Sequence, residues 1–212
     1  FQGRGVAQDK KTAFNWYRKA AVQEMPPAQY MLGVMYRDGL GTIQNSKEAV
    51  KWFGKAASQG DVSSQYNLGV MYDTGRVVIK DDKEAVKWYH MAAERGFANA
   101  QFNLGLKYEK GQGVDQSNKE AIKWYRKAGD QGIARAQYNL GMLYDFSQNN
   151  KEAVKWVRKA AEQGYSSAQH NLGARYFLGA TLTKDFVLAH KWLSLAGPIK
   201  RSSGLKLIDS VE

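Results

Sequence analysis

The same two short sequence words return along this 212-residue chain at a nearly constant spacing. The first is a Leu-Gly pair with a tyrosine three residues after the glycine, as in Leu68, Gly69 and Tyr72. The second is an alanine three residues ahead of a tryptophan, as in Ala121 and Trp124. The tryptophans of the second word are 36, 36, 36, 32 and 36 residues apart. A period in this range indicates stacked supersecondary units in place of one globular core.

The repeats predict one solenoid domain, residues 1–212, of five full units and a fragment. We expect a partial repeat at 1–24, full repeats at 25–60, 61–96, 97–132, 133–164 and 165–198, and a C-terminal capping segment at 199–212. The chain opens with a loop word like that at 109–114, without the helix that precedes it elsewhere, so we expect a longer parent protein. Between Tyr144 and Ala153 four residues are missing relative to the other units, which predicts a tighter turn.

Each full unit has the pattern of two helices. In the unit at 25–60, Leu32 and Met35 belong to the apolar stripe of a first helix. Trp52 and Phe53 belong to the stripe of a second helix, where each buried indole removes about 150–250 Å² from water. Few prolines and no long β-branched runs favour an all-α chain.

Glycines and small polar residues have expected roles both inside these helices and at their ends. Gly33 lies inside a helix, where it costs about 1 kcal/mol of propensity, so we expect it to let a neighbouring helix approach closely. Gly39 and Gly41 suit a loop with positive φ, and Gly60 ends the second helix. The expected N-caps of the second helices are Asn45 or Ser46, Asp81 or Asp82, and Ser117 or Asn118.

The words Ala-Gln-Tyr-Asn-Leu-Gly-Met-Leu-Tyr, Gly-x-Gly-Val and Lys-Glu-Ala-x-Lys-Trp-Tyr-x-Lys-Ala-Ala-Glu-x-Gly resemble Sel1-like repeats, relatives of the tetratricopeptide repeats. The resemblance covers nearly the whole chain. It implies a right-handed α/α superhelix that acts as an adaptor in protein complexes. Many bacterial members are exported, so the compartment stays open between export and the cytoplasm.

Residues that vary between repeats and point outward are the candidates for binding. On the first helix, the positions two before Leu, one after Gly and one after Tyr share one face, because they are separated by four and three residues. We call it the first-helix face, and by resemblance to tetratricopeptide repeats it lines the concave groove. Its residues are Tyr30, Val34, Arg37, Tyr66, Val70, Asp73, Phe102, Leu106, Glu109, Tyr138, Met142, Asp145 and His170, continuing to Ala174 and Phe177.

This face predicts a protein or peptide partner. Rigid aromatic side chains are the usual energetic anchors of interfaces, and we expect Tyr66, Phe102, Tyr138 and Met142 to be central. The relatives that clamp a peptide's C-terminal carboxylate use Lys and Asn at the corresponding places, which this chain lacks. A longer peptide, helix or protein edge therefore fits better. The alternative is that the rings only pack between adjacent first helices.

A row of asparagines precedes the Leu-Gly words. It could hold an extended peptide backbone by paired hydrogen bonds, or bond neighbouring helices, and the second role is favoured because the adjacent leucine belongs to the core. The row is Asn67, Asn103, Asn139 and Asn171.

The formal charge of +11 and the pI near 9.6 raise nucleic acid or an anionic surface as the alternative partner. Most of the excess lies on second helices, as Lys47, Lys51 and Lys55 with Glu48 nearby. This pattern describes a solvated convex face without interleaved aromatics, so nucleic acid is disfavoured.

Catalytic signals are lacking. His90, His170 and His190 fall in different units with no metal-ligand spacing, and His90 should be exposed. There is no cysteine and no run of about 18 apolar residues. We therefore expect a monomeric, non-enzymatic chain with no cofactor, no metal and no transmembrane segment.

Overall fold

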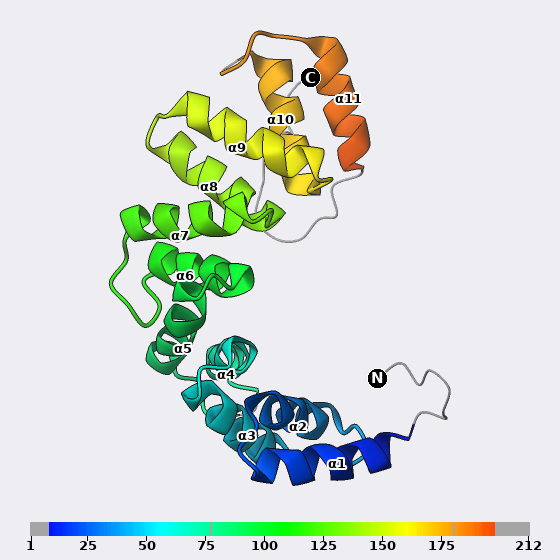
Figure 1. The fold of residues 1–212 in the computed structure, drawn as a ribbon. Helices are drawn as coiled ribbons and strands as arrows, with labels where there is room; N and C mark the ends of the chain where they lie inside the picture. Colours follow the sequence, from blue (N-terminus) through cyan, green and yellow to red (C-terminus); the bar gives the residue numbers. More distant parts are fainter. Residues whose placement is uncertain (1–8, 77, 180, 198–212) are drawn as a thin grey trace. The chain divides into compact units, whose positions relative to one another are not determined.

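The computed structural model describes residues 9–76, 78–179 and 181–197, and all regular structure in these residues is α-helical. The capping segment expected at 199–212 lies outside them. The helices of this part are α1 (Lys10–Val22), α2 (Pro26–Asp38), α3 (Ser46–Ser58), α4 (Val62–Thr74), α5 (Asp82–Glu94), α6 (Ala98–Lys110), α7 (Asn118–Asp130), α8 (Ala134–Phe146), α9 (Asn150–Glu162), α10 (Ser166–Leu178) and α11 (Phe186–Ala196) (Figure 1).

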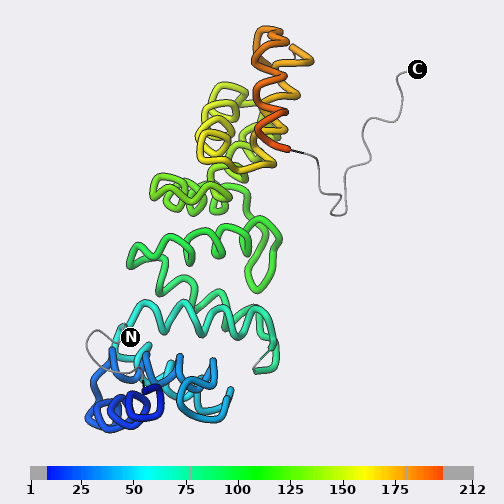
Figure 2. Tube along the Cα trace, turned by 90° about the vertical axis from the view of Figure 1, so that its right-hand side faces the viewer, coloured from blue at the N-terminus to red at the C-terminus, as the bar shows by residue number. Residues whose placement is uncertain are grey.

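The helices pack in the order of the sequence. The chain forms two compact units, Phe1–Ala136 and Gln137–Glu212, and each is described by itself. In the first unit α1 to α7 each contact the next helix, as successive hairpins of the trace (Figure 2). In the second unit α8 meets α9 where Gly141 faces Val157, and α9, α10 and α11 follow. The predicted all-α solenoid of helix pairs is confirmed, with α2, α4, α6, α8 and α10 as first helices.

The glycine of each Leu-Gly word marks a close approach between the two helices of a repeat. A Cβ atom built on Gly33 would lie 2.8 Å from the ring of Phe53, and one on Gly69 would lie 2.5 Å from the ring of Tyr89. The neighbouring Leu32 and Phe53 are fully buried. The expected reason for a glycine inside these helices is therefore confirmed.

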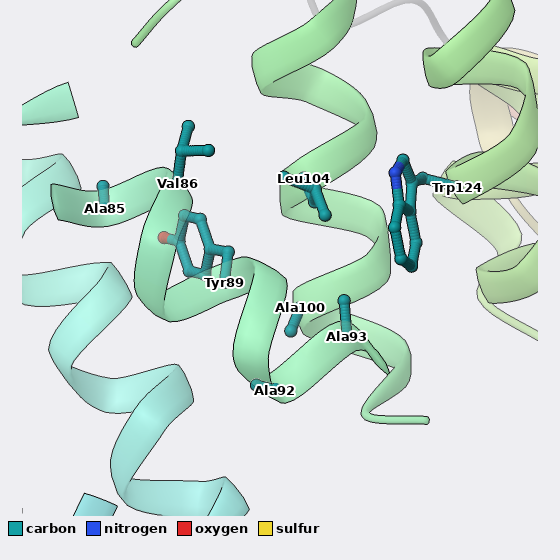
Figure 3. Close-up of a cluster of buried hydrophobic side chains, with 8 residues drawn as sticks. All are labelled: Ala85, Val86, Tyr89, Ala92, Ala93, Ala100, Leu104 and Trp124. Carbon is teal, nitrogen blue, oxygen red and sulfur yellow. The ribbon is translucent and has the colours of Figure 1, made fainter. Parts of the chain in front are cut away.

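The core of the first unit repeats one composition at each step. In the cluster of Figure 3, Tyr89 of α5, Leu104 of α6 and Trp124 of α7 are all buried. Trp124 thus joins its own repeat to the second helix before it, and Trp52 shares a cluster with Ala21 of α1 in the same way. Trp16 departs from the expectation of a buried indole, since it is 65% exposed.

Helix ends follow the predicted chemistry. Asn45, Asp81 and Ser117 are the N-caps of α3, α5 and α7, each accepting a hydrogen bond from a backbone N–H of the first turn. The cap that ends α3 is Gln59, one residue earlier than expected, and Gly60 follows with positive φ. Gly41 has a φ of 72° and a Cβ there would lie 2.1 Å from the Lys10 carbonyl oxygen, so only glycine fits.

Substituting two glycines of one hairpin distinguishes the effect of packing on stability from the effect of helix propensity. Gly33→Ala places a methyl group against the ring of Phe53. The resulting overpacking should outweigh the gain in helix propensity, so we expect the free energy of unfolding to fall by about 1 kcal/mol. Gly54→Ala on α3 meets nothing within 4 Å and should raise it by about 0.5–1 kcal/mol. Urea unfolding followed by circular dichroism measures both. Equal effects at the two positions would contradict the close approach.

Candidate partner-binding face

The first-helix face is partly buried in both units. In the first unit Tyr30, Tyr66 and Leu106 are all partly exposed. In the second unit Tyr138 is partly exposed and Met142 is 37% exposed. The face therefore offers aromatic and aliphatic surface to solvent on each unit.

The tyrosine rings pack against neighbouring rings and are only partly exposed. Tyr66 lies 6.0 Å from the ring of Tyr89 and 4.9 Å from the ring of Phe97, between centroids. Tyr138 lies 5.4 Å from Tyr165. Burial raises the pKa of Tyr66 and of Tyr138, so both hydroxyls stay protonated near neutral pH. The two roles considered for these rings, packing and contact, are thus compatible.

Phe102 differs from the other ring positions because it is only 5% exposed. The Arg135 guanidinium carbon lies 4.8 Å from its ring centroid, and Tyr125 lies 5.8 Å away. Phe102 therefore supports the face from below, and the exposed group at this place is Arg135. The sequence reasoning missed Arg135, although the corresponding positions of the other repeats are uncharged: Pro27, Ser63, Asn99 and Ser167.

The charged edge of the face is bonded within the chain. Arg37 donates to Asp38 at 2.7 Å, and Tyr125 donates its hydroxyl hydrogen bond to Glu109. In the second unit Asp145 accepts from Arg175. These charges shape the stack and have little capacity left for a partner.

The asparagine row is also engaged in the stack. The Asn67 side chain accepts from Arg37 at 2.7 Å and donates to the Ser63 carbonyl at 2.8 Å. The Asn171 side chain accepts from Arg175 at 2.6 Å. The Arg37 contact joins α2 to α4, whereas the Ser63 and Arg175 contacts lie within α4 and α10, so these side chains are bonded inside the stack both between and within helices.

One lysine ties three consecutive helices together. The Lys107 side chain on α6 is 4% exposed and pairs with Asp73 of α4 and Asp82 of α5. It also contacts the Gln112 side chain at 3.5 Å. Its hydrogen bond to Asp82, at 2.7 Å, is the main reason that the pKa of Asp82 is lowered from its ordinary value of 3.8. Such a pair is costly to break from one side.

The ion pair between Lys107 and Asp82 should make the free energy of unfolding depend on pH. Because the folded-state pKa of Asp82 is lowered, its contribution is present above pH 3.8 and is lost as the pH falls through the lowered value. Asp82→Asn should lower the free energy of unfolding by about 1 kcal/mol at neutral pH and by less at about pH 3, measured by urea unfolding. Asp115→Asn makes the same charge change in an exposed loop and should have little effect at either pH.

A second polar system, the buried glutamine row, was not recognised in the sequence. Gln29 donates to the Ala21 carbonyl at 3.2 Å, and thus satisfies a carbonyl at the end of the preceding second helix. Gln59 in turn donates to the Gln29 side chain at 2.8 Å. The same contacts recur at Gln101 and Gln131. The signal was present as a glutamine three residues before each Leu-Gly word.

One repeat departs from the pattern of the buried glutamine row, and a substitution there can test what the row contributes to stability. Arg95 stands where the other repeats have Gln59, Gln131 and Gln163, and the buried Gln65 Oε1 has no hydrogen-bond partner in the described part of the chain. Arg95→Gln should supply one and raise the free energy of unfolding by about 1 kcal/mol. Thermal unfolding would detect this as a raised Tm. Arg95→Ala is the control, because it removes the arginine without supplying an amide and should not stabilise.

The lysine-rich face of the second helices does not match the expectation that it would lack interleaved aromatic side chains. Tryptophan rings do lie there, beneath the lysines: Lys55 is 4.8 Å from the centroid of Trp52, and Lys127 is 4.3 Å from that of Trp124. The lysine stems cover the rings, because they leave the helix one turn from each tryptophan. The indoles are consequently not free platforms on which bases could stack.

The histidines and acidic residues form no metal-binding constellation in the part of the chain that is described. His90 is exposed, as expected, and its ring centroid lies 5.6 Å from that of Trp124, with the two rings in an edge-to-face arrangement. No described helix has the length and apolar character needed to cross a membrane.

Paired helices stacked in sequence order, with one face of partly exposed rings, define an α-solenoid repeat protein. The Sel1 repeat model matches residues 1–23, 26–61, 62–97, 98–133, 134–165 and 166–197. The chain belongs to the Sel1 repeat family. The comparison with curated proteins found no match.

Solved structures place the chain beside bacterial proteins. A protective antigen of uropathogenic Escherichia coli strains, with an SLR fold, is 36% identical over 91% of this chain, with a TM-score of 0.81. This chain spans only 42% of that protein. A Sel1 repeat protein from Oxalobacter formigenes is 34% identical over 88% of this chain and 78% of its own, with a TM-score of 0.83. YrrB, a TPR protein with an unusual peptide-binding site, is 19% identical over 85% of this chain and 90% of its own, with a TM-score of 0.57. It shows the fold alone.

Proposed function

We propose that this chain is a non-enzymatic scaffold that binds a protein or peptide partner along its first-helix face. The observation that carries the proposal is the arrangement of Tyr66 and Tyr138, whose rings pack against neighbouring rings and which remain partly exposed to solvent. A ring already held in place loses little entropy on docking, so its contact area is converted efficiently into affinity.

The apolar and the charged positions of the first-helix face have different roles in the proposed binding. Val70, Leu106 and Met142 supply aliphatic surface one helical turn from the rings. The charged edge is already paired within the chain, for example Asp145 with Arg175, so it sets the position of the helices. We therefore assign affinity to the aromatic and aliphatic positions and structural support to the charged ones.

The lysine face of the second helices favours a partner less. One lysine on each of α3, α5, α7 and α9 is paired with a glutamate one turn away, as Lys51 with Glu48 at 3.3 Å and Lys155 with Glu152 at 3.1 Å. The rings beneath are covered by lysines of the same face. Neither phosphates nor bases are offered the combination of free cations and open rings that single-stranded nucleic acid requires.

Two methionines of nearly equal exposure test the proposal. Met142 on the first-helix face is 37% exposed and Met91 on the second helix α5 is 39% exposed. Met142→Glu places a charge in the proposed contact and should reduce capture of the partner about tenfold, whereas Met91→Glu should not. Proteins captured from an extract of the cells that encode the chain are quantified by mass spectrometry.

Circular dichroism controls for folding in both variants, which should melt within a few degrees of the unmodified chain because both side chains are solvent-exposed. Equal capture by Met142→Glu, Met91→Glu and the unmodified chain would remove the first-helix face as the binding surface.

A further inference from the structure

Arg135 on α8 is an exposed guanidinium without a carboxylate partner among the described residues. The other arginines of the described first helices are both paired, Arg37 with Asp38 and Arg175 with Asp145. Arg135 instead lies over the ring of Phe102, with 4.8 Å between the guanidinium carbon and the ring centroid. It is therefore the one arginine of these helices whose charge is left for another molecule.

The surroundings of Arg135 form a small polar site beside apolar surface. The hydroxyl of Tyr66 is close enough for the charge of Arg135 to act against the rise in its pKa, and Asn103 shares a hydrogen bond with the same hydroxyl. Leu106 follows Phe102 by one helical turn and is partly exposed.

The acidic groups of α6 do not compete for Arg135. Glu109 lies seven residues after Phe102, about 10 Å along the helix axis. Its carboxylate already accepts from the Tyr125 hydroxyl. A carboxylate that arrives at Arg135 therefore meets a cation and hydrogen-bonding groups of the first unit.

We propose that Arg135 binds the side-chain carboxylate of an Asp or Glu in the partner segment, with a neighbouring apolar residue of that segment placed against Leu106. The inference rests on the proposed function and names the chemistry of its partner. A guanidinium held over an aromatic ring keeps its planar edge available for two parallel hydrogen bonds to a carboxylate.

The test uses the full 212-residue chain and a phage-displayed library of random 12-residue peptides. Selected peptides should share an Asp or Glu next to an apolar residue. The most enriched sequence is then synthesised, and its Kd is measured by fluorescence anisotropy. Arg135→Gln should weaken binding about tenfold, because a charge-assisted hydrogen bond is lost. Arg135→Lys keeps the charge without the planar edge and should lose part of the affinity.

Arg18→Gln is the matched control, since it removes the same charge from an exposed position on the second helix α1. It should leave the Kd within twofold of the unmodified chain. Replacing the acidic residue of the peptide by its amide should weaken binding to the unmodified chain as much as Arg135→Gln does. The same replacement should not weaken binding to the Arg135→Gln chain any further. Amidation of the peptide's C-terminus should have no effect.

The outcomes separate the two proposals. Peptides that bind the unmodified chain and Arg135→Gln equally, or whose binding depends on the C-terminal carboxylate, overturn the role of Arg135 and leave the scaffold function standing. A library that yields no binding peptide overturns both. Circular dichroism of each variant controls for folding.

Discussion

The contact between a glycine of a first helix and a large side chain of the following second helix is the constraint on which the rest depends. Because Gly69 has no side chain, the ring of Tyr89 lies directly against the α4 backbone. The ring then extends along α4, and its hydroxyl reaches Asp73 at 3.1 Å. Tyr125 reaches Glu109 in the same way. One packing contact thus closes each of these two hairpins and fixes the edge of the face beside it.

Two polar systems then determine how one hairpin stacks on the next. Near its start, each of several first helices inserts a buried glutamine, such as Gln101, that donates to the last turn of the preceding second helix. Near the end of α6, Lys107 pairs with Asp73 and Asp82 from the two helices before it. A buried polar group leaves an unsatisfied partner if a helix slides, so these contacts select one register. Stiffness of this kind makes the exposed rings a pre-organised surface.

The sequence predicted the features that depend on local chemistry or on the period. Helix pairs, the N-caps Asn45 and Asp81, and the close approach at Gly33 all follow from patterns within one repeat. What it did not predict are side chains that act between repeats. The glutamine row was hidden because glutamine is normally a surface residue. Arg135 was hidden because its partner ring, Phe102, lies on another helix, so no local spacing connects them.

The same distinction bears on the binding function proposed for this chain. Columns that stay constant between repeats, such as Leu32 and its counterparts, are buried, and they build the scaffold. Some columns that vary are buried, such as that of Lys107, and others lie on the exposed side of the first helices, where Met142 replaces Val70 and Arg135 replaces Ser63. A change in an exposed column alters the surface without disturbing the hairpin beneath it. Recognition can therefore be set one repeat at a time, and a single unpaired charge within an otherwise internally paired face has a large effect on which partner fits.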